Sequence, residues 1–219
     1  MIQETLKPQL NIPVVNNSPF IQFFNIDCIE FMKSKPDKCY DLAIVDPPYG
    51  IDINSSGTHF KEKYDVKDWD KKTPTDEYFT ELKRVSKNQI IWGGNYFLDR
   101  LGNCKCFIIW DKIIAEDMSF AMCEMAWTSF LNGAKIYKKT AMQENRIHPT
   151  QKPVQLYRWL LNRYATKGMK ILDTHGGSFN HAIAAEIEGF DLDIMDIDPE
   201  YYQAGLNAFK LHKMQQRLF

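Results

Sequence analysis

The sequence predicts an α/β fold in which helices cover both faces of a mostly parallel sheet. From residue 21 onwards, short runs rich in β-branched and aromatic residues alternate with helical patterns. Residues 40–45 are almost wholly apolar, which is typical of a central strand buried on both faces. A chain of 219 residues with 44% hydrophobic content is long enough for one full-sized domain and too short for two. We therefore expect a flexible N-terminal arm at residues 1–19 and one domain over residues 20–219.

The strands and helices are expected in alternation along the chain. Strands are predicted at residues 21–27, 40–45, 89–92, 105–110, 123–130, 134–138, 169–172 and 191–197, and helices at residues 28–35, 73–86, 153–164 and 179–188 and from residue 199 onwards. Thr73 is expected to cap the second helix, with Pro74 at its first position, and Gly189 to end the fourth. Asp198 is expected to cap the last helix. Residues 50–72 are polar and lack a clear period, which predicts a long loop of the kind that is usually functional or mobile.

The balance of charges excludes a broadly basic surface that coats nucleic acid. The sequence has 27 Lys and Arg against 28 Asp and Glu, and its formal net charge is -1. Contact with DNA would therefore depend on local patches. The candidate patches are Lys61, Lys63, Lys67, Lys71 and Lys72, then Lys135, Lys138, Lys139 and Arg146. A run of charges is equally typical of a solvated face.

The cysteines and the N-terminal residues further limit the class of protein. The five cysteines are Cys28, Cys39, Cys104, Cys106 and Cys123. They are odd in number and lack the C-x-x-C spacing of a zinc or redox site, so we expect buried thiols and no metal, with metal binding as the minor alternative. Residues 1–17 are polar and contain prolines, and no run of about 18 apolar residues occurs. These features predict a cytoplasmic protein without a membrane-spanning segment.

The first motif with chemical meaning is Asp46-Pro47-Pro48-Tyr49, directly after the apolar run. Two successive prolines donate no backbone N–H, so the carbonyls before them are displayed beside a carboxylate and an aromatic ring. An exocyclic amino group on adenine or cytosine is a poor nucleophile because its lone pair is delocalised into the ring. If Asp46 and the Pro47 carbonyl each accept one N–H, the nitrogen shifts toward sp³ and can attack a methyl sulfonium, and its developing charge is stabilised. Tyr49 would stack on a base flipped from the duplex. The alternative is a turn that ends a strand.

The second motif is a glycine turn, residues 173–178, between a predicted strand and a predicted helix. Such a turn lets the backbone approach a ligand closely and directs helix-terminal N–H groups at it. About 20 residues further on, Asp196 is expected at the end of a strand, where a carboxylate can accept both hydroxyls of a ribose.

The third motif is the hexapeptide His148-Pro149-Thr150-Gln151-Lys152-Pro153, which leads into a predicted helix. Taken alone, it is equally typical of a polar turn that caps a helix.

Together these motifs resemble those of the S-adenosylmethionine-dependent DNA amino-methyltransferases. Asp-Pro-Pro-Tyr is similar to their catalytic motif, in which Asp at the first place is the adenine-N6 form and Ser the usual cytosine-N4 form. The hexapeptide matches a segment that in this family precedes the cofactor loop and closes over the carboxylate end of the cofactor. The order of catalytic loop, hexapeptide and glycine loop is the permuted order of the beta group. The resemblance covers about residues 20 to 205 and implies a Rossmann-like methyltransferase fold.

The resemblance implies the site residues and the reaction. The catalytic residues would be Asp46, Pro47, Pro48 and Tyr49. S-adenosyl-L-methionine would be bound by Asp27, Cys28, Asp46, His148, Thr150, Lys152, Asp173, His175, Gly176, Gly177, Ser178 and Asp196. Asp173 would lie near the methionyl amino group, and Thr150 and Lys152 would donate to the cofactor carboxylate. The implied reaction is methyl transfer to N6 of adenine in double-stranded DNA, with the target base flipped.

The chain also departs from the family pattern. Thr174-His175 replaces Pro-Phe in the cofactor loop, and Phe179 replaces its last glycine. Only about 16 residues, 132–147, are available as a target-recognition segment, so few side chains can read bases. We therefore expect a short or relaxed sequence preference, or a contribution to DNA recognition from a second subunit or from the loop at residues 50–72. Small enzymes of this group are often homodimers, which is expected here by resemblance only.

Several alternatives stay open from the sequence. The substrate could be cytosine N4, RNA or a protein amide, since the acceptor cluster fits any flat amino group. The chain could also be an inactive cofactor-binding partner of another subunit.

Trp92, Trp110 and Trp127 are expected in the core, and Trp69 is expected to contact DNA or to belong to a lid. His59 and His181 are given no role.

Overall fold

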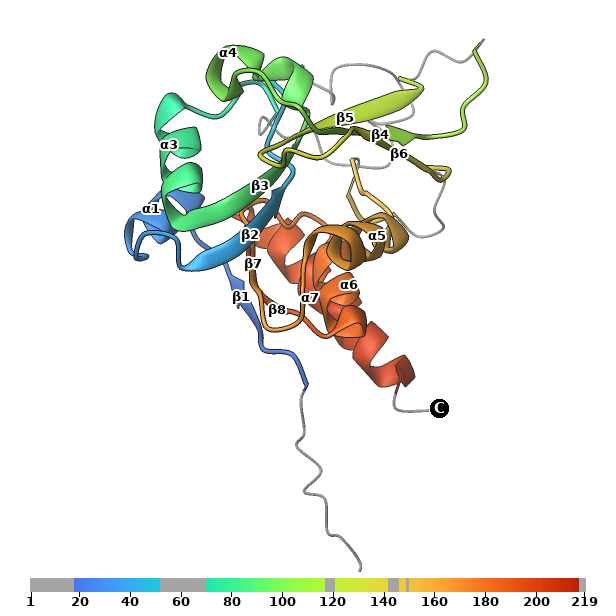
Figure 1. Ribbon diagram of the computed structural model, residues 1–219. Coiled ribbons are helices and arrows are strands. Elements are labelled where there is room, and N and C mark those ends of the chain that lie inside the picture. Colours follow the sequence, from blue (N-terminus) through green and yellow to red (C-terminus); the bar gives the residue numbers. More distant parts are fainter. Residues whose placement is uncertain (1–17, 52–69, 117–120, 142–145, 149, 217–219) are drawn as a thin grey trace, which may run out of the picture.

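Eight strands form one mixed sheet in the order β1-β8-β7-β2-β3-β5-β4-β6 (Figure 1). The computed structural model describes residues 18–51, 70–116, 121–141, 146–148 and 150–216. Most of the predicted N-terminal arm lies outside these ranges. So does most of the predicted long loop, with His59, Trp69, Lys61, Lys63 and Lys67.

The strands and helices alternate as the sequence predicts. The strands are β1 (Ile21–Phe24), β2 (Tyr40–Val45), β3 (Ser86–Trp92), β4 (Phe107–Asp111), β5 (Cys123–Thr128), β6 (Lys135–Lys138), β7 (Lys170–Asp173) and β8 (Asp191–Met195). The helices are α1 (Cys28–Lys33), α3 (Asp76–Val85), the 3-10 turn η2 (Gly94–Tyr96), α4 (Leu98–Leu101), α5 (Val154–Tyr164), α6 (Asn180–Glu188) and α7 (Pro199–Gln216).

The direction of the strands makes the sheet mostly parallel, and the predicted α/β class is confirmed. Every neighbouring pair is parallel except those formed by β5, which runs opposite to both β3 and β4. The strand order reverses at β2, because the chain continues to β3 on one side and reaches β7 and β8 on the other. In open α/β sheets, such a reversal leaves a crevice at the carboxyl ends of the strands, where ligands bind.

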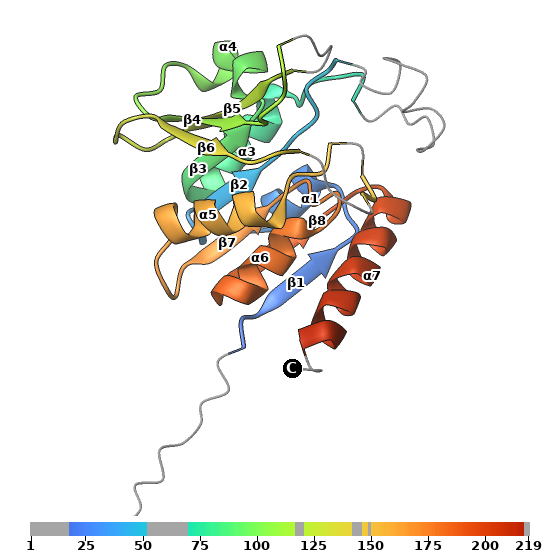
Figure 2. The same ribbon diagram turned by 90° about the vertical axis from the view of Figure 1, so that its right-hand side faces the viewer.

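Helices cover both faces of the sheet, with α5, α6 and α7 on one face and α1, α3 and α4 on the other (Figures 1 and 2). The central strand β2 shows the alternation that this requires. Leu42 and Ile44 belong to the core beneath α5 and α6, while Ala43 and Val45 belong to the core beneath α1 and α3. All four side chains are at most 1% exposed, which explains why the strand reads as a continuous apolar run.

The end of the first strand and the beginnings of α3 and α6 differ from the sequence prediction. Asp27 is not part of the first strand but caps α1, since its Oδ1 accepts hydrogen bonds from the amides of Ile29 and Glu30. Thr75, and not Thr73, caps α3 through a bond from the Tyr78 amide. Thr75 has extended backbone, with φ -75° and ψ 165°, and α3 begins at residue 76, so Thr73 and Pro74 lie before the helix. Phe179 is the N-cap of α6, which begins at residue 180.

Other local signals are confirmed. Gly189 ends α6 in a left-handed conformation, and the Asp198 carboxylate accepts from the first amides of α7. Trp92, Trp110 and Trp127 are at most 7% exposed and lie in the core, as predicted. Of the helices in the described ranges, none is long and apolar enough to cross a membrane.

The packing of α5 yields a test of the core. Leu160 belongs to α5 and is fully buried, so Leu160→Ala should lower the free energy of unfolding by about 2–5 kcal/mol. Leu131→Ala is the matched control, because Leu131 is 77% exposed and should change stability by less than about 0.5 kcal/mol. Denaturant titration measures both, and equal effects of the two variants would contradict this packing.

Candidate functional site

The reversal of strand order brings the three predicted acids to one edge of the sheet. Asp46 follows β2, Asp173 ends β7 and Asp196 follows β8, and these three strands are parallel neighbours. Residues at the carboxyl ends of parallel strands share one edge. The sequence-predicted catalytic and cofactor motifs therefore meet at the crevice that the topology creates.

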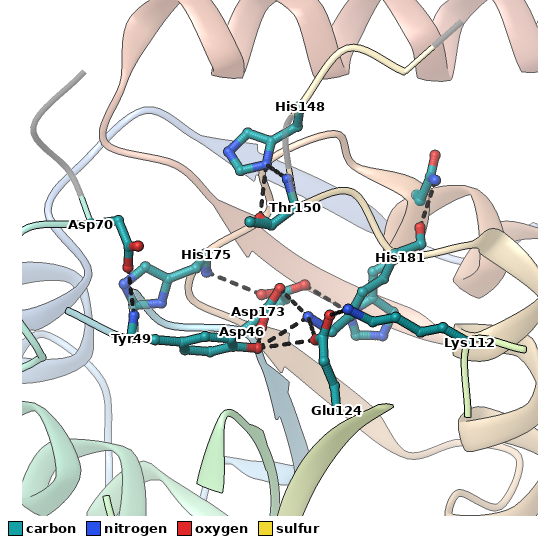
Figure 3. Close-up of polar contacts among 12 residues, drawn as sticks. Asp46, Tyr49, Asp70, Lys112, Glu124, His148, Thr150, Asp173, His175 and His181 are labelled. Carbon is teal, nitrogen blue, oxygen red and sulfur yellow. Dashed lines mark hydrogen bonds and ion pairs between the residues drawn. The ribbon is translucent and has the colours of Figure 1, made fainter. Parts of the chain in front are cut away.

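The catalytic-loop motif lines a pocket at this edge. The pocket is open to solvent and is lined by Asp46, Pro47, Pro48, Tyr49, Ile51, Asp70 and Thr150. Thr150 comes from the hexapeptide, so two of the three motifs share this pocket. Asp70 Oδ1 accepts hydrogen bonds from the amides of Tyr49 at 2.7 Å and Gly50 at 3.1 Å. Asp70 thus fixes the turn after the two prolines (Figure 3).

The ring of Tyr49 is held on a glycine turn. It stacks on Tyr96 with ring centroids 5.1 Å apart and an interplanar angle of 17°. Gly93 lies against the same ring, and a Cβ atom at this position would come within 2.2 Å of Tyr49 Cε1. Gly93 also has a φ of 68°, which glycine adopts without strain. The turn after β3 therefore sets the position of the Tyr49 ring.

The polar end of Tyr49 joins a buried cluster of charges. Tyr49 Oη donates to Asp46 Oδ1 at 2.6 Å. Lys152 Nζ donates to Asp46 Oδ2 at 2.5 Å and to Glu124 Oε2 at 2.9 Å, and its side chain is 1% exposed. Lys112 Nζ pairs with Glu124 Oε1 at 2.7 Å. Two carboxylates and two ammonium groups therefore meet at the catalytic loop (Figure 3).

Burial and neighbouring charges set the protonation of this cluster. Burial raises the pKa of Asp46, with the Lys152 charge opposing and the Glu124 charge adding to the shift. For Glu124, the effect of burial is outweighed by Lys152 and Lys112, and its pKa falls to about 2. Burial opposes the charged form of Lys152, but Asp46 and Glu124 outweigh it and raise its pKa. Burial, then Asp46 and Glu124, raise the pKa of Tyr49 well above its usual value, so the phenol remains a donor.

The glycine turn is fixed by acids from two strands. Asp173 Oδ1 accepts from the His175 amide at 3.0 Å, and Asp173 Oδ2 lies 2.9 Å from His181 Nδ1. The amide of Gly177 donates to Asp196 Oδ2 at 2.9 Å. Burial lowers the pKa of His175 to about 4, so this imidazole is neutral at pH 7. The loop is therefore held in shape by its own strand and by the end of β8.

Phe179 has a backbone conformation that is usual for glycine. It adopts a φ of 56°, the left-handed region that costs an ordinary residue about 1–2 kcal/mol. Its ring is fully buried and packs on Phe23 at a centroid distance of 5.2 Å. A Cβ atom at Gly176 would come within 2.4 Å of this ring, and one at Gly205 within 2.6 Å. The backbone thus keeps the conformation of a glycine while two other glycines make room for the phenylalanine.

The remaining predicted cofactor residues border the same edge. His148 Nδ1 lies 3.1 Å from the Thr150 hydroxyl, and its ring packs on Tyr201. Asp27 caps α1, and the next residue, Cys28, is half-buried. Burial, then the Asp27 charge, raise the pKa of the Cys28 thiol to about 12. Ser178 is buried in the loop.

The residues at this edge fit the chemistry of S-adenosyl-L-methionine. Asp196 is half-buried and presents a carboxylate that can accept from ribose hydroxyls. The Thr150 hydroxyl lines the pocket and is a suitable donor to a carboxylate. Lys152 was predicted for that same role, but its three ammonium protons already have acceptors in Asp46, Glu124 and Tyr49. Its contact with a cofactor carboxylate stays a prediction.

Sequence reasoning missed four residues of the site, Asp70, Lys112, Glu124 and His181. Asp70 lies in the long polar loop, and His181 shows no sequence signal beyond its place eight residues after Asp173. Glu124 is the second residue of β5, which runs antiparallel to its neighbours and so begins at the edge where they end. An acid near the start of an antiparallel strand would have been the one available signal.

Among known proteins, the chain is similar to solved structures and not to any family model or curated sequence. No protein-family model matches the chain, and no curated protein matches it in sequence. The fold matches solved structures of S-adenosylmethionine-dependent DNA methyltransferases, which confirms the predicted fold.

Three structures illustrate the match. M1.HpyAVI in complex with SAM is 16% identical, with a TM-score of 0.59 over 86% of this chain and 100% of that chain. TTHA0409 of Thermus thermophilus, a candidate DNA modification methylase solved with S-adenosyl-L-methionine, is 17% identical, with a TM-score of 0.58 over 88% and 95% of the two chains. The cytosine-N4-specific PvuII DNA methyltransferase is 12% identical, with a TM-score of 0.61 over 86% of each chain.

The glycine turn under Tyr49 can be tested by adding one methyl group. Gly93→Ala should displace the Tyr49 ring and strain a left-handed residue, lowering the free energy of unfolding by about 1–3 kcal/mol. Gly133→Ala is the matched control, because a Cβ atom there meets nothing within 4 Å. Denaturant titration of both variants measures the difference. A Gly93→Ala variant as stable as the control would mean that Tyr49 is not held by this turn.

Proposed function

We propose that the protein transfers a methyl group from S-adenosyl-L-methionine to an exocyclic amino group of DNA, N6 of adenine. The observation that carries the proposal is the Asp46 carboxylate, which lines a pocket beside Pro47 and Tyr49 at the carboxyl edge of the sheet. The fold match to DNA methyltransferases supports the class of reaction. The choice of adenine is supported by the resemblance, in which Asp at the first place of the motif is the adenine form.

The chain's own residues would activate the amino group by accepting hydrogen bonds from its two N–H groups. Each oxygen of Asp46 already accepts one hydrogen bond and has a second lone pair for a substrate N–H. The Pro47 carbonyl would accept the other N–H, so the nitrogen shifts toward sp³ and its lone pair is withdrawn from conjugation with the ring. When bound, the cofactor supplies an electrophilic methyl group on a sulfonium. The negative charge of Asp46 then favours the transition state, because positive charge develops on the nitrogen.

The cofactor would lie along the edge from Asp196 to Thr150. Asp196 would accept from the ribose hydroxyls, and the loop of residues 173–178 would approach the cofactor with its backbone. Thr150 and His148 would lie at the carboxylate end. Asp27, which caps α1, would lie near the adenine.

Recognition of DNA would depend on few side chains. Lys71, Lys72 and Lys138 are exposed. Lys71 and Lys72 follow Asp70, which lines the pocket, and Lys138 is the last residue of β6. The segment at residues 132–147 carries the short strand β6 and offers little surface for reading bases. We therefore propose a short or relaxed target sequence, and a homodimer as the form that would add a second DNA-binding surface.

Methyl transfer with labelled S-adenosyl-L-methionine and unmethylated double-stranded DNA tests the proposal. Wild type should form N6-methyladenine, and Asp46→Ala or Asp46→Asn should lower kcat at least about 100-fold, because the charge at the amino group is lost. Asp99→Ala is the matched control, since the Asp99 carboxylate is 75% exposed. Product nucleosides identify the base.

Other results would redirect the proposal. N4-methylcytosine as the product would keep the mechanism and change the substrate base. Label in RNA or in a protein amide would change the substrate class. If no substrate accepts the label although the cofactor binds, the protein is an inactive partner subunit.

The Asp196 carboxyl gives the proposal a pH dependence. Burial, then the Asp198 and Asp173 charges, raise the pKa of Asp196 to about 6. Its ionised form accepts ribose hydroxyls, so the dissociation constant of the cofactor should be constant above about pH 7 and rise up to about tenfold per pH unit below pH 6. Calorimetry measures this constant, and Asp196→Asn should remove the pH dependence and weaken binding. An equally steep rise in the variant would assign the pH dependence to another group.

A further inference from the structure

Glu124 lies outside every sequence motif, yet it faces the catalytic carboxylate. Its Oε2 accepts from Lys152 at 2.9 Å, and Tyr49 Oη lies 3.3 Å from the same oxygen. Its side chain is 17% exposed, against 14% for Asp46. The antiparallel direction of β5 places this acid at the edge of the sheet where β2 ends. Lys152 therefore lies between two carboxylates and not beside one.

We propose that Glu124 is a positioning residue for methyl transfer, which shares the Lys152 ammonium with Asp46 and so keeps the Asp46 carboxylate available to the target amino group. The proposal rests on the proposed function. It assigns Glu124 no contact with the substrate and places its effect entirely on Lys152 and Asp46.

The charges of the cluster explain why sharing matters. Asp46, Glu124, Lys152 and Lys112 together are neutral, which a buried group of ions requires. Without Glu124, Lys152 would have Asp46 as its one anionic partner in the described part of the site. A charge-assisted hydrogen bond to a carboxylate is strong and draws electron density from it. An Asp46 that alone neutralises an ammonium would accept a substrate N–H less well.

The order of protonation supports the same division of roles. Glu124, with a pKa of about 2, stays ionised throughout the range in which Asp46, with a raised pKa, titrates. The negative charge of Glu124 is itself one cause of the raised pKa of Asp46. The other groups near Asp46 keep their charge state, since Lys152 remains charged and the phenols of Tyr49, Tyr78 and Tyr157 remain neutral.

The experiment replaces Glu124 by its uncharged isostere in the full-length protein. Glu124→Gln should lower kcat about 10- to 100-fold while the KM for DNA and the cofactor dissociation constant stay within about twofold. The acidic limb of the pH profile of kcat/KM should move to lower pH, because loss of a nearby negative charge lowers the pKa of Asp46. Glu77→Gln is the control, since Glu77 forms an exposed pair with Lys33 away from the site.

A second variant separates this effect from misfolding. Glu124→Gln leaves one excess positive charge, whereas the double variant Glu124→Gln with Lys112→Gln leaves a neutral pair of Asp46 and Lys152. The double variant should unfold at nearly the wild-type temperature and still show the low kcat and the shifted acidic limb. Recovery of kcat in the double variant would overturn the proposal, because the loss would then come from the excess charge.

The outcomes distinguish this inference from the proposed function. A wild type without methyl transfer to any substrate would remove the proposed function, and the inference with it. An active wild type with an equally active Glu124→Gln and an unmoved acidic limb would overturn the inference alone. A Glu124→Gln variant that loses cofactor binding to the same extent as kcat would likewise overturn it, because Glu124 would then support the cofactor site.

Discussion

The buried ammonium of Lys152 requires negative charge on more than one side, and this requirement connects the parts of the site. Transfer of an ammonium group from water to a protein interior costs several kcal/mol even after relaxation. Here the compensation comes from Asp46 at the end of β2 and Glu124 near the start of β5. The segment before α5 is thereby fixed against the central strand and against the antiparallel part of the sheet. Loss of any one of these elements would leave a buried charge without its partner.

The loop of residues 173–178 is constrained by packing in addition to its hydrogen bonds with Asp173 and Asp196. Phe179 keeps a left-handed backbone that a glycine would adopt without strain, and its ring occupies the space left by Gly176 and Gly205. The strain is therefore balanced by burial of a large aromatic side chain. This departure from the family pattern is accommodated by two other positions. Residue 179 thus has a left-handed backbone although it is a phenylalanine and not a glycine.

The sequence predicts the strands and helices well, because each depends on a local pattern. The apolar run of β2, the helix stops and the motif positions at strand ends are all local signals. The helix starts were less accurate, since the predicted cap Thr73 and the actual cap Thr75 are the same residue type two positions apart. Glu124 was not predicted, because the sheet alone brings it near Lys152, and His181 was not predicted, because its contact with Asp173 depends on the course of the turn between β7 and α6. The residues outside the motifs that contact the motif side chains could therefore be identified only from the three-dimensional structure.

The pairing of β1 with β8 has a consequence for synthesis of the protein. The amide of Phe20 bonds to the side chain of Asp191, a separation of 171 residues, and β1 has β8 as its neighbour in the sheet. At about 5–20 residues per second, the ribosome needs roughly 9 to 34 s to make the intervening chain. During this time β1 and its aromatic residues Phe23 and Phe24 have no strand to join. The nascent chain therefore exposes an unpaired strand until β8 has been made, and unpaired strand edges of this kind favour aggregation during synthesis.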